Sequence, residues 1–270
     1  MKADMAMLCV AVLGILAAPC LGIDPKRVHL VDMFPRQSLN ASPNIVRNYI
    51  FRGNNPVEDG QFAFDKLLDT VRASASTECG VTLPEKFRVV DIDLENLSDP
   101  GQKTELDFWK NHPELGEVFS WPTLGTILDV KHTPFEKEVV RSGSWAVRGN
   151  ADDLDSRMKM LNGMLKNITD VSTVFYVHCN AGCDRTGEFI GSYMMSYLGY
   201  NATTAMGEDC RQCGRCPNFY ATNAMGFWCL TLQERKERTN LGNCKDFAGC
   251  KYLGDCNAHN PTHPANPCPH

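Results

Sequence analysis

Apolar residues along this chain follow two different periods, one typical of strands and one typical of helices. Runs rich in β-branched and aromatic residues predict strands over residues 87–94, 124–130, 139–147 and 171–177. Apolar residues at helical spacing predict helices over residues 62–71, 152–168, 188–198 and 220–238. Because strands and helices alternate, the sequence predicts an α/β fold with a mostly parallel central sheet and helices on both faces.

The start of the chain carries an apolar run of a different kind. Residues 5–18 follow Lys2 and contain no charged residue, but the run is too short to cross a bilayer as a helix. It matches the core of a secretory signal peptide, and the residues after it predict cleavage following Gly22. An uncleaved membrane anchor is the alternative. After cleavage, we expect no integral membrane span, because no later segment has the roughly eighteen apolar residues required.

Four Asn-X-Ser/Thr sequons agree with passage through the secretory pathway. These glycosylation candidates are Asn40, Asn96, Asn167 and Asn201. Together with the predicted signal peptide, they indicate a protein that is secreted or lies in the lumen of the secretory or endolysosomal pathway. The acidic balance, a net charge of −5 and a pI of about 5.8, argues against a nucleic-acid partner.

The chain contains thirteen cysteines, of which signal cleavage would remove Cys9 and Cys20. The remaining number is odd, so at least one thiol lacks an intramolecular partner. Most of the others fall between Cys210 and Cys268, which predicts a disulfide-rich C-terminal region. We therefore expect a domain over residues 23–240 and a Cys/Pro-rich extension over residues 241–270. The Cys-X-X-Cys-X-X-Cys spacing of residues 210–216 leaves a metal or iron–sulfur site open.

The segment that carries chemistry follows the strand predicted over residues 171–177. Residues 178–187 are His-Cys-Asn-Ala-Gly-Cys-Asp-Arg-Thr-Gly, between that strand and a predicted helix. Such a junction directs backbone N–H groups and the helix dipole into one concavity, which suits a tetrahedral oxyanion. Gly182 lets the loop curl, and Arg185 offers a planar fork to two phosphate oxygens. Cys179 begins the loop, where the same dipoles should stabilise its thiolate as a nucleophile.

The remaining residues of this loop have supporting roles. We expect phosphate to be bound by the loop residues Asn180, Ala181, Gly182, Cys183, Asp184, Arg185 and Thr186. Thr186 can donate to the sulfur or help to release it, while His178 and Gly187 support the loop. Cys183 is either a structural half-cystine, which the parity of cysteines favours, or a transient partner of Cys179.

The loop resembles the HCxxGxxR(S/T)G signature of the cysteine-dependent phosphatases, the superfamily of tyrosine and dual-specificity phosphatases. Its fixed positions are met at Cys179, Gly182, Arg185, Thr186 and Gly187, preceded by His178. The resemblance covers residues 45–240: residues 51–53 are similar to the family's Tyr/Phe-Arg-Gly entry strand, and residues 87–94 resemble its early strand. Glu95 stands where an Arg is common in the family.

The resemblance implies a phosphatase fold and a two-step hydrolysis of phosphate monoesters. Cys179 would form a thiophosphate intermediate that water then hydrolyses, and no metal or other cofactor is needed. The family's general acid is an Asp on a preceding loop, but Trp145-Ala146-Val147 has Val at the corresponding place. Two other aspartates are candidates. Asp152 lies nearby, where capping the next helix is its alternative role, and Asp184 belongs to an Asp-Arg-Thr run similar to that of myotubularin-like and bacterial triple-specificity phosphatases.

Three classes of function follow from these features. The first is a phosphatase acting on phosphotyrosine, other phosphoprotein or phosphoinositide substrates. Its partner would be a phosphorylated protein or lipid head group. The absence of a basic residue from the variable loop positions argues against a polyphosphorylated ring, while the Asp-Arg-Thr resemblance argues for one. The second is an inactive phosphatase-fold binding module, and the third is a thiol–disulfide protein that uses Cys179 and Cys183.

Overall fold

A five-stranded sheet organises the part of the chain that the computed structural model describes, residues 22–36, 45–133 and 152–245. The strand order is β1-β2-β7-β5-β6. The strands are β1 (His29–Phe34), β2 (Asn48–Asn54), β5 (Arg88–Asp93), β6 (Gly116–Ser120) and β7 (Thr173–Cys179), and a separate hairpin joins β3 (Val57–Glu58) to β4 (Gln61–Phe62). Only the edge strand β1 runs antiparallel to its neighbour among the strands of the five-stranded sheet. This confirms the predicted α/β fold with a mostly parallel sheet.

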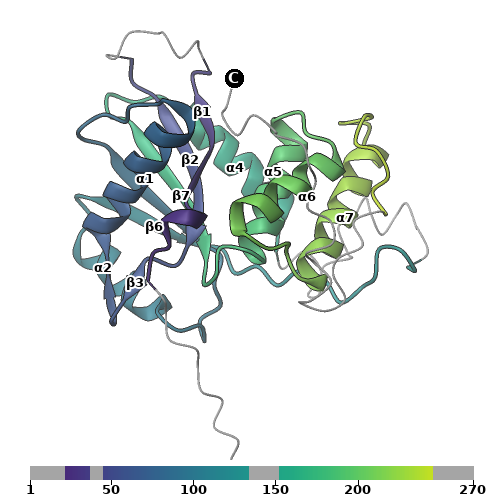
Figure 1. Ribbon diagram of the computed structural model, residues 1–270, viewed down its shortest axis with the longest axis horizontal. Helices are drawn as coiled ribbons and strands as arrows, with labels where there is room; N and C mark the ends of the chain where they lie inside the picture. Colours follow the sequence, from purple (N-terminus) through teal and green to yellow (C-terminus); the bar gives the residue numbers. More distant parts are fainter. Residues whose placement is uncertain (1–21, 37–44, 134–151, 246–270) are drawn as a thin grey trace, which may run out of the picture.

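Helices cover both faces of the sheet (Figure 1). One face carries α1 (Phe64–Cys79) and α2 (Gln102–Asn111). The other carries α4 (Leu154–Lys166), α5 (Arg185–Tyr197) and, packed against α5, α6 (Ala202–Cys213) and α7 (Phe219–Glu234). A short 3-10 helix, η1 (Pro25–Arg27), precedes β1 and contacts α6.

The central strand β7 is buried on both faces. Val174 and Tyr176 belong to the core on the side of α1 and α2, whereas Phe175 and Val177 belong to the core on the side of α5. Such a nearly continuous apolar run is typical of a parallel strand covered by helices on both sides. The strand therefore presents its last residues at a rigid edge of the sheet.

Most of the predicted elements are present. The helices expected over residues 62–71, 152–168, 188–198 and 220–238 correspond to α1, α4, α5 and α7, and the strands expected over residues 87–94 and 171–177 to β5 and β7. The strand predicted over residues 124–130 is wrong, because this segment is a loop. Its amides at Leu124 and Gly125 bind the Asp152 carboxylate instead of a neighbouring strand. The sequence pattern missed β1, β6, α2 and α6.

Disulfides confirm the predicted C-terminal disulfide-bonded region. The pairs are Cys183–Cys213, Cys210–Cys216 and Cys229–Cys244, and Cys79 is also a half-cystine. Two of these bonds link the loop after β7, α6 and the segment that follows α6, and the third joins α7 to Cys244, within the segment expected as the extension. The metal or iron–sulfur alternative for residues 210–216 is wrong, because all three of its thiols are in disulfides.

Several sequence predictions fall outside the described residues. These are the signal peptide up to residue 21, Asn40, the strand over residues 139–147 with Trp145-Ala146-Val147, and the extension beyond residue 245. Of the other sequons, Asn96 is half-buried and Asn167 and Asn201 are exposed. Within the ranges that are described, every helix falls short of the length and hydrophobicity that crossing a bilayer requires.

Candidate active site

The candidate site lies at the carboxyl end of β7, where ligands bind in open parallel sheets. Cys179 is the last residue of β7, and α5 begins six residues later at Arg185. β2 and β5 lie on either side of β7, with Asn54 paired to Cys179 and Asp93 paired to His178. Residues that follow β2 and β5 are therefore next to the first residues of the loop.

Cys179 is the one free cysteine among the described residues. Only 2% of it is exposed. Its backbone carbonyl accepts the N–H of Asn55 at 2.9 Å and the N–H of Gly182 at 3.2 Å. Bonds from the neighbouring strand end and from the loop itself thus fix the residue that carries the expected nucleophile.

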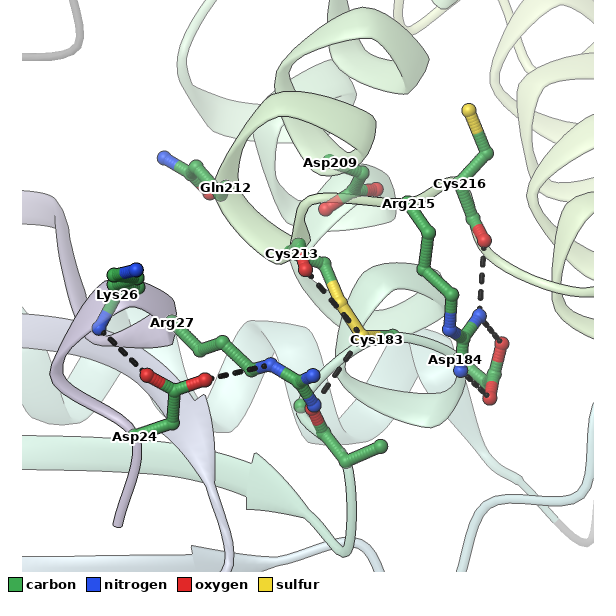
Figure 2. The surroundings of a disulfide bond; sticks show 12 residues. Asp24, Lys26, Arg27, Cys183, Asp184, Asp209, Gln212, Cys213, Arg215 and Cys216 are labelled. Carbon is green, nitrogen blue, oxygen red and sulfur yellow. Dashed lines mark hydrogen bonds and ion pairs between the residues drawn. A yellow bond between two sulfur atoms is a disulfide. The ribbon is translucent and has the colours of Figure 1, made fainter. Parts of the chain in front are cut away.

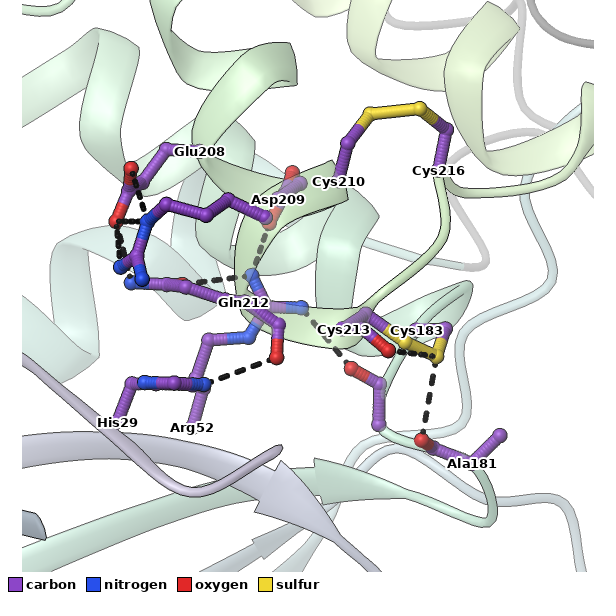
Figure 3. A network of polar contacts seen from close by, with 12 residues as sticks. His29, Arg52, Ala181, Cys183, Glu208, Asp209, Cys210, Gln212, Cys213 and Cys216 are labelled. Carbon is purple, nitrogen blue, oxygen red and sulfur yellow. Dashed lines mark hydrogen bonds and ion pairs between the residues drawn. A yellow bond between two sulfur atoms is a disulfide. The ribbon is translucent and has the colours of Figure 1, made fainter. Parts of the chain in front are cut away.

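Two arginines bind the carbonyl oxygens of the loop. Arg27 Nη1 donates to Ala181 O at 2.7 Å (Figure 2), and Arg52 Nη2 donates to Gly182 O at 2.9 Å (Figure 3). A trans peptide points its C=O and N–H in opposite directions, so the N–H of Cys183 is directed away from Arg52. This is the backbone arrangement that an anion-binding loop requires.

Gly182 is required by both conformation and space. Its φ is +70°, and a Cβ atom there would lie 2.5 Å from Gly53 O in β2. Any side chain would therefore push the loop away from the sheet. The sequence predicted that the loop needs a glycine at position 182, but only the fold shows that Gly53 O leaves no room for a side chain.

Arg52 is fully buried and forms an ion pair with Asp209 of α6. The same guanidinium donates to Gln212 Oε1 at 3.0 Å (Figure 3). Arg52 therefore links the sheet, the loop and α6. From the sequence, Arg52 was predicted only as part of an entry strand, and its supporting role was missed.

Cys183 and Asp184 are held by the segment that connects α6 to α7 (Figure 2). Cys183 is bonded to Cys213, which excludes a standing Cys179–Cys183 bridge in this structure. The Asp184 carboxylate receives two hydrogen bonds of 2.7 Å from Arg215 and one of 2.8 Å from the Asn218 N–H. Asp184, the first candidate for the acid, is thus occupied by a guanidinium and a backbone amide.

Arg185 forms an ion pair with Asp99, which lies in the turn after β5. Asp99 Oδ2 also accepts the N–H of Asn96 at 2.8 Å. Burial acts to lower the pKa of Arg185, but the Cys179 thiolate and Asp99 outweigh it, so the pKa lies above its ordinary value. Sequence reasoning missed Asp99, since no motif connects it to the loop.

Thr186 and Gly187 form the first turn of α5. The Thr186 hydroxyl is fully buried and has no hydrogen-bond partner within the described part of the chain. No such partner competes with the donation to the sulfur, which stays a prediction. A Cβ atom on Gly187 would lie 2.7 Å from Pro217 Cγ, so this glycine lets the α6–α7 connection approach α5.

His178 lies behind the loop, fully buried between two carboxylates. Its Nε2 is 2.9 Å from Asp91 Oδ1 and 3.2 Å from Glu105 Oε1. Burial acts to lower the His178 pKa, but these two acids raise it well above its ordinary value. Donor atoms of the three residues lie within 4.8 Å of one another, a spacing that a cation can use, but the imidazolium already supplies positive charge there.

Asp152, the second candidate for the acid, is buried below the loop that follows β6. It accepts the N–H groups of Leu124 at 2.9 Å and Gly125 at 3.0 Å. Burial raises its pKa, and these two hydrogen bonds act to lower it. The capping role considered for Asp152 is not observed, since Asp153 occupies the N-cap position of α4.

The loop after β6 begins with Trp121-Pro122-Thr123. Trp145-Ala146-Val147 lies outside the described residues, whereas this Trp-Pro pair follows the end of β6 directly. Its third residue is Thr123, which is buried and carries no carboxyl group.

Glu95 is a further acid at this edge of the sheet that sequence reasoning did not include. It is fully buried, its Oε1 accepts Asn55 Nδ2 at 3.1 Å, and its Oε2 has no hydrogen-bond partner among the described residues. Burial raises the Glu95 pKa to about 7, while His178, the Asn55 hydrogen bond and Arg185 act to lower it and Asp93 acts to raise it.

Comparison with known proteins adds no relative to this description. No protein-family model matches the chain, and no curated protein matches it either.

Proposed function

We propose that this protein is a cysteine-dependent phosphatase of the secretory pathway, which hydrolyses phosphate monoesters through a cysteinyl-phosphate. The observation that carries the proposal is the state of one thiol. Cys179 remains free among paired cysteines, at the start of a strand–loop–helix junction that also positions Arg185. A cysteine with a purely structural role would not require an arginine able to bind phosphate at the end of its loop.

The reaction has two balanced steps. The Cys179 thiolate attacks phosphorus, an S–P bond forms, and the P–O bond to the leaving group breaks as that oxygen takes a proton. Water then attacks phosphorus, the S–P bond breaks, and the thiolate and inorganic phosphate are released. Arg185 and the loop N–H groups stabilise the equatorial oxygens in both steps, because they are held in place before the charge develops.

The partial exposure of Asp99, the ion-pair partner of Arg185, supports this role for Arg185. Asp99 is about one-quarter exposed, so its carboxylate can return to water when phosphate oxygens take its place on the guanidinium. The buried Arg52 is different, since its ion pair with Asp209 excludes water on both sides. Arg52 therefore shapes the loop, and Arg185 is the arginine that binds substrate.

The proposed substrates are phosphoproteins, phosphotyrosine among them, or phosphorylated lipid head groups. Arg27 and Arg215 lie beside the loop and bring positive charge that the loop sequence lacks. Asp24 and Asp184 neutralise these arginines, so the rim has no large excess of positive charge. The disulfides support an oxidising compartment for this activity.

One observation favours the second candidate, a binding module that has lost catalysis. Thr123 supplies no carboxyl group at the third position of the Trp-Pro loop. Turnover of an aryl phosphate separates the two functions. The phosphatase proposal predicts that Arg185→Lys and Arg185→Met both lose turnover, because an ammonium cannot reproduce the guanidinium fork. A protein that binds vanadate but shows no turnover before mutation would be the binding module.

A further inference from the structure

The proposed reaction needs a carboxyl group that still holds its proton near neutral pH. Three acids at the site already have their carboxyl groups engaged by other protein groups. Asp99 and Asp184 are paired with Arg185 and Arg215, and Asp152 accepts two backbone N–H groups. The first two are occupied by guanidinium groups, and both oxygens of the third are bound by the loop after β6.

Glu95 is placed differently. β2 and β5 flank β7, and the residue that follows each of them donates a backbone hydrogen bond to the end of β7. From the β2 side, Asn55 donates its backbone N–H to Cys179 O at 2.9 Å and its side-chain amide to Glu95 Oε1 at 3.1 Å. From the β5 side, Leu94 donates its N–H to His178 O at 2.9 Å. Asn55 thus links the Glu95 carboxyl to the end of β7 at Cys179.

The second oxygen of Glu95 makes this placement chemically useful. Oε2 is buried without a hydrogen-bond partner in the described residues, so one oxygen is fixed by Asn55 and the other is unengaged. The charged and titratable groups facing it are His178 of β7, Asp93 of β5 and Arg185 of α5. Burial prevails over the two cations, and the resulting pKa of about 7 leaves a proton to give at neutral pH.

We propose that Glu95 is the catalytic acid of this site. In the first step its carboxyl group gives its proton to the leaving oxygen as the S–P bond forms. In the second step its carboxylate takes one proton from the attacking water, which restores the acid. The assignment rests on the proposed phosphatase function. Burial is no objection to it, because Cys179 is only 2% exposed and a substrate that reaches the sulfur reaches the same depth.

The test compares two substrates that differ in their need for a proton. Nitrophenyl phosphate releases a stable anion, whereas glycerol phosphate releases an alkoxide that must be protonated. For Glu95→Gln, kcat/KM should fall about 100-fold or more with glycerol phosphate and less than about 10-fold with nitrophenyl phosphate. Glutamine keeps an acceptor for Asn55, so a merely structural role predicts nearly full activity on both substrates.

Two comparisons keep the test decisive. Asp152→Asn and Asp184→Asn should each lower kcat/KM by the same factor for both substrates. A selective loss of glycerol phosphate turnover in either variant would instead assign the role of the acid to that aspartate. In the unmutated protein, kcat/KM for glycerol phosphate should fall relative to kcat/KM for nitrophenyl phosphate as the pH rises above about 7. A ratio of the two values that does not change with pH overturns the assignment, even if Glu95→Gln does not fold. Turnover retained by Cys179→Ser would instead overturn the proposed function itself.

Discussion

The disulfide between Cys183 and Cys213 joins the loop that begins at Cys179 to the last residue of α6. Its Cys183 sulfur lies 3.4 Å from Ala181 O, the oxygen that also accepts a hydrogen bond from Arg27 (Figure 3). The loop is therefore held by one covalent bond and by hydrogen bonds from separate elements. As the proposed nucleophile, Cys179 must stay reduced, whereas Cys183, four residues later, must stay oxidised to keep its disulfide.

Reduction of this disulfide should lower activity. Once Cys183 is released, the loop loses its covalent connection to α6, and closing such a chain segment contributes about 2–4 kcal/mol. We expect turnover of an aryl phosphate to fall as thiol reductant is added, with a parallel fall in melting temperature. The double variant Cys183→Ala/Cys213→Ala should start lower and respond less to reductant. Turnover that increases on reduction would show that the bond restrains rather than supports the loop.

Gly182→Ala should abolish phosphate binding, because the added Cβ meets Gly53 O at 2.5 Å. Gly199→Ala is the matched control, since Gly199 also has a positive φ, +82°, but nothing lies within 4 Å of its Cβ position. The control should cost only about 1 kcal/mol of backbone strain and retain vanadate binding. Calorimetric titration with vanadate measures the difference. Equal affinity in the two variants would contradict the assigned packing of the loop on β2.

Arg52→Met should be among the most destabilising single changes in the domain. It leaves Asp209 buried without its cation and Gly182 O without its donor. Breaking a buried pair in this way costs about 3–5 kcal/mol. Adding Asp209→Leu should recover part of the loss, because the uncompensated charge is removed. Urea unfolding of the parent, the single and the double variant measures this, and an unchanged midpoint in Arg52→Met would show that the pair contributes little.

Glu95 should also make stability depend on pH. Its pKa is raised from 4.5 to about 7 in the folded protein, so its neutral form is favoured by folding. The stability that it contributes is fully present below pH 4.5 and is lost as the pH rises through about 7. Relative to the parent, Glu95→Gln should gain about 1–3 kcal/mol between these limits, given about 1.4 kcal/mol for each unit of pKa. Urea midpoints measured across this range test the prediction, and parallel curves would contradict it.

The strand–loop–helix junction was the part of the molecule most accessible from sequence. Residues 171–177 favour a buried strand, because all of them except Ser172 are apolar, aromatic or β-branched, and the helix after Gly187 had a clear apolar face. Loop residues that act through their own backbone, such as Gly182, were identified for the same reason. Their conformations are determined locally.

Contacts between distant elements could not be predicted from sequence. Arg52 and Asp209, or Arg185 and Asp99, become partners only when the strand order is known. Residues 124–130 have the composition of a strand, but the amides of Leu124 and Gly125 bind the Asp152 carboxylate, which comes from a distant part of the chain. α6 was missed because its cysteines and polar residues conceal its helical period.

The most direct test of the central claim is to trap the intermediate. Brief reaction of the secreted protein with an aryl phosphate, acid quenching and mass spectrometry of the peptide containing residues 178–187 should show one phosphate on Cys179. The adduct should be absent from Cys179→Ser and should accumulate in Glu95→Gln, whose second step lacks its base. Turnover without any phosphate on Cys179, or turnover that persists in Cys179→Ser, would contradict the account.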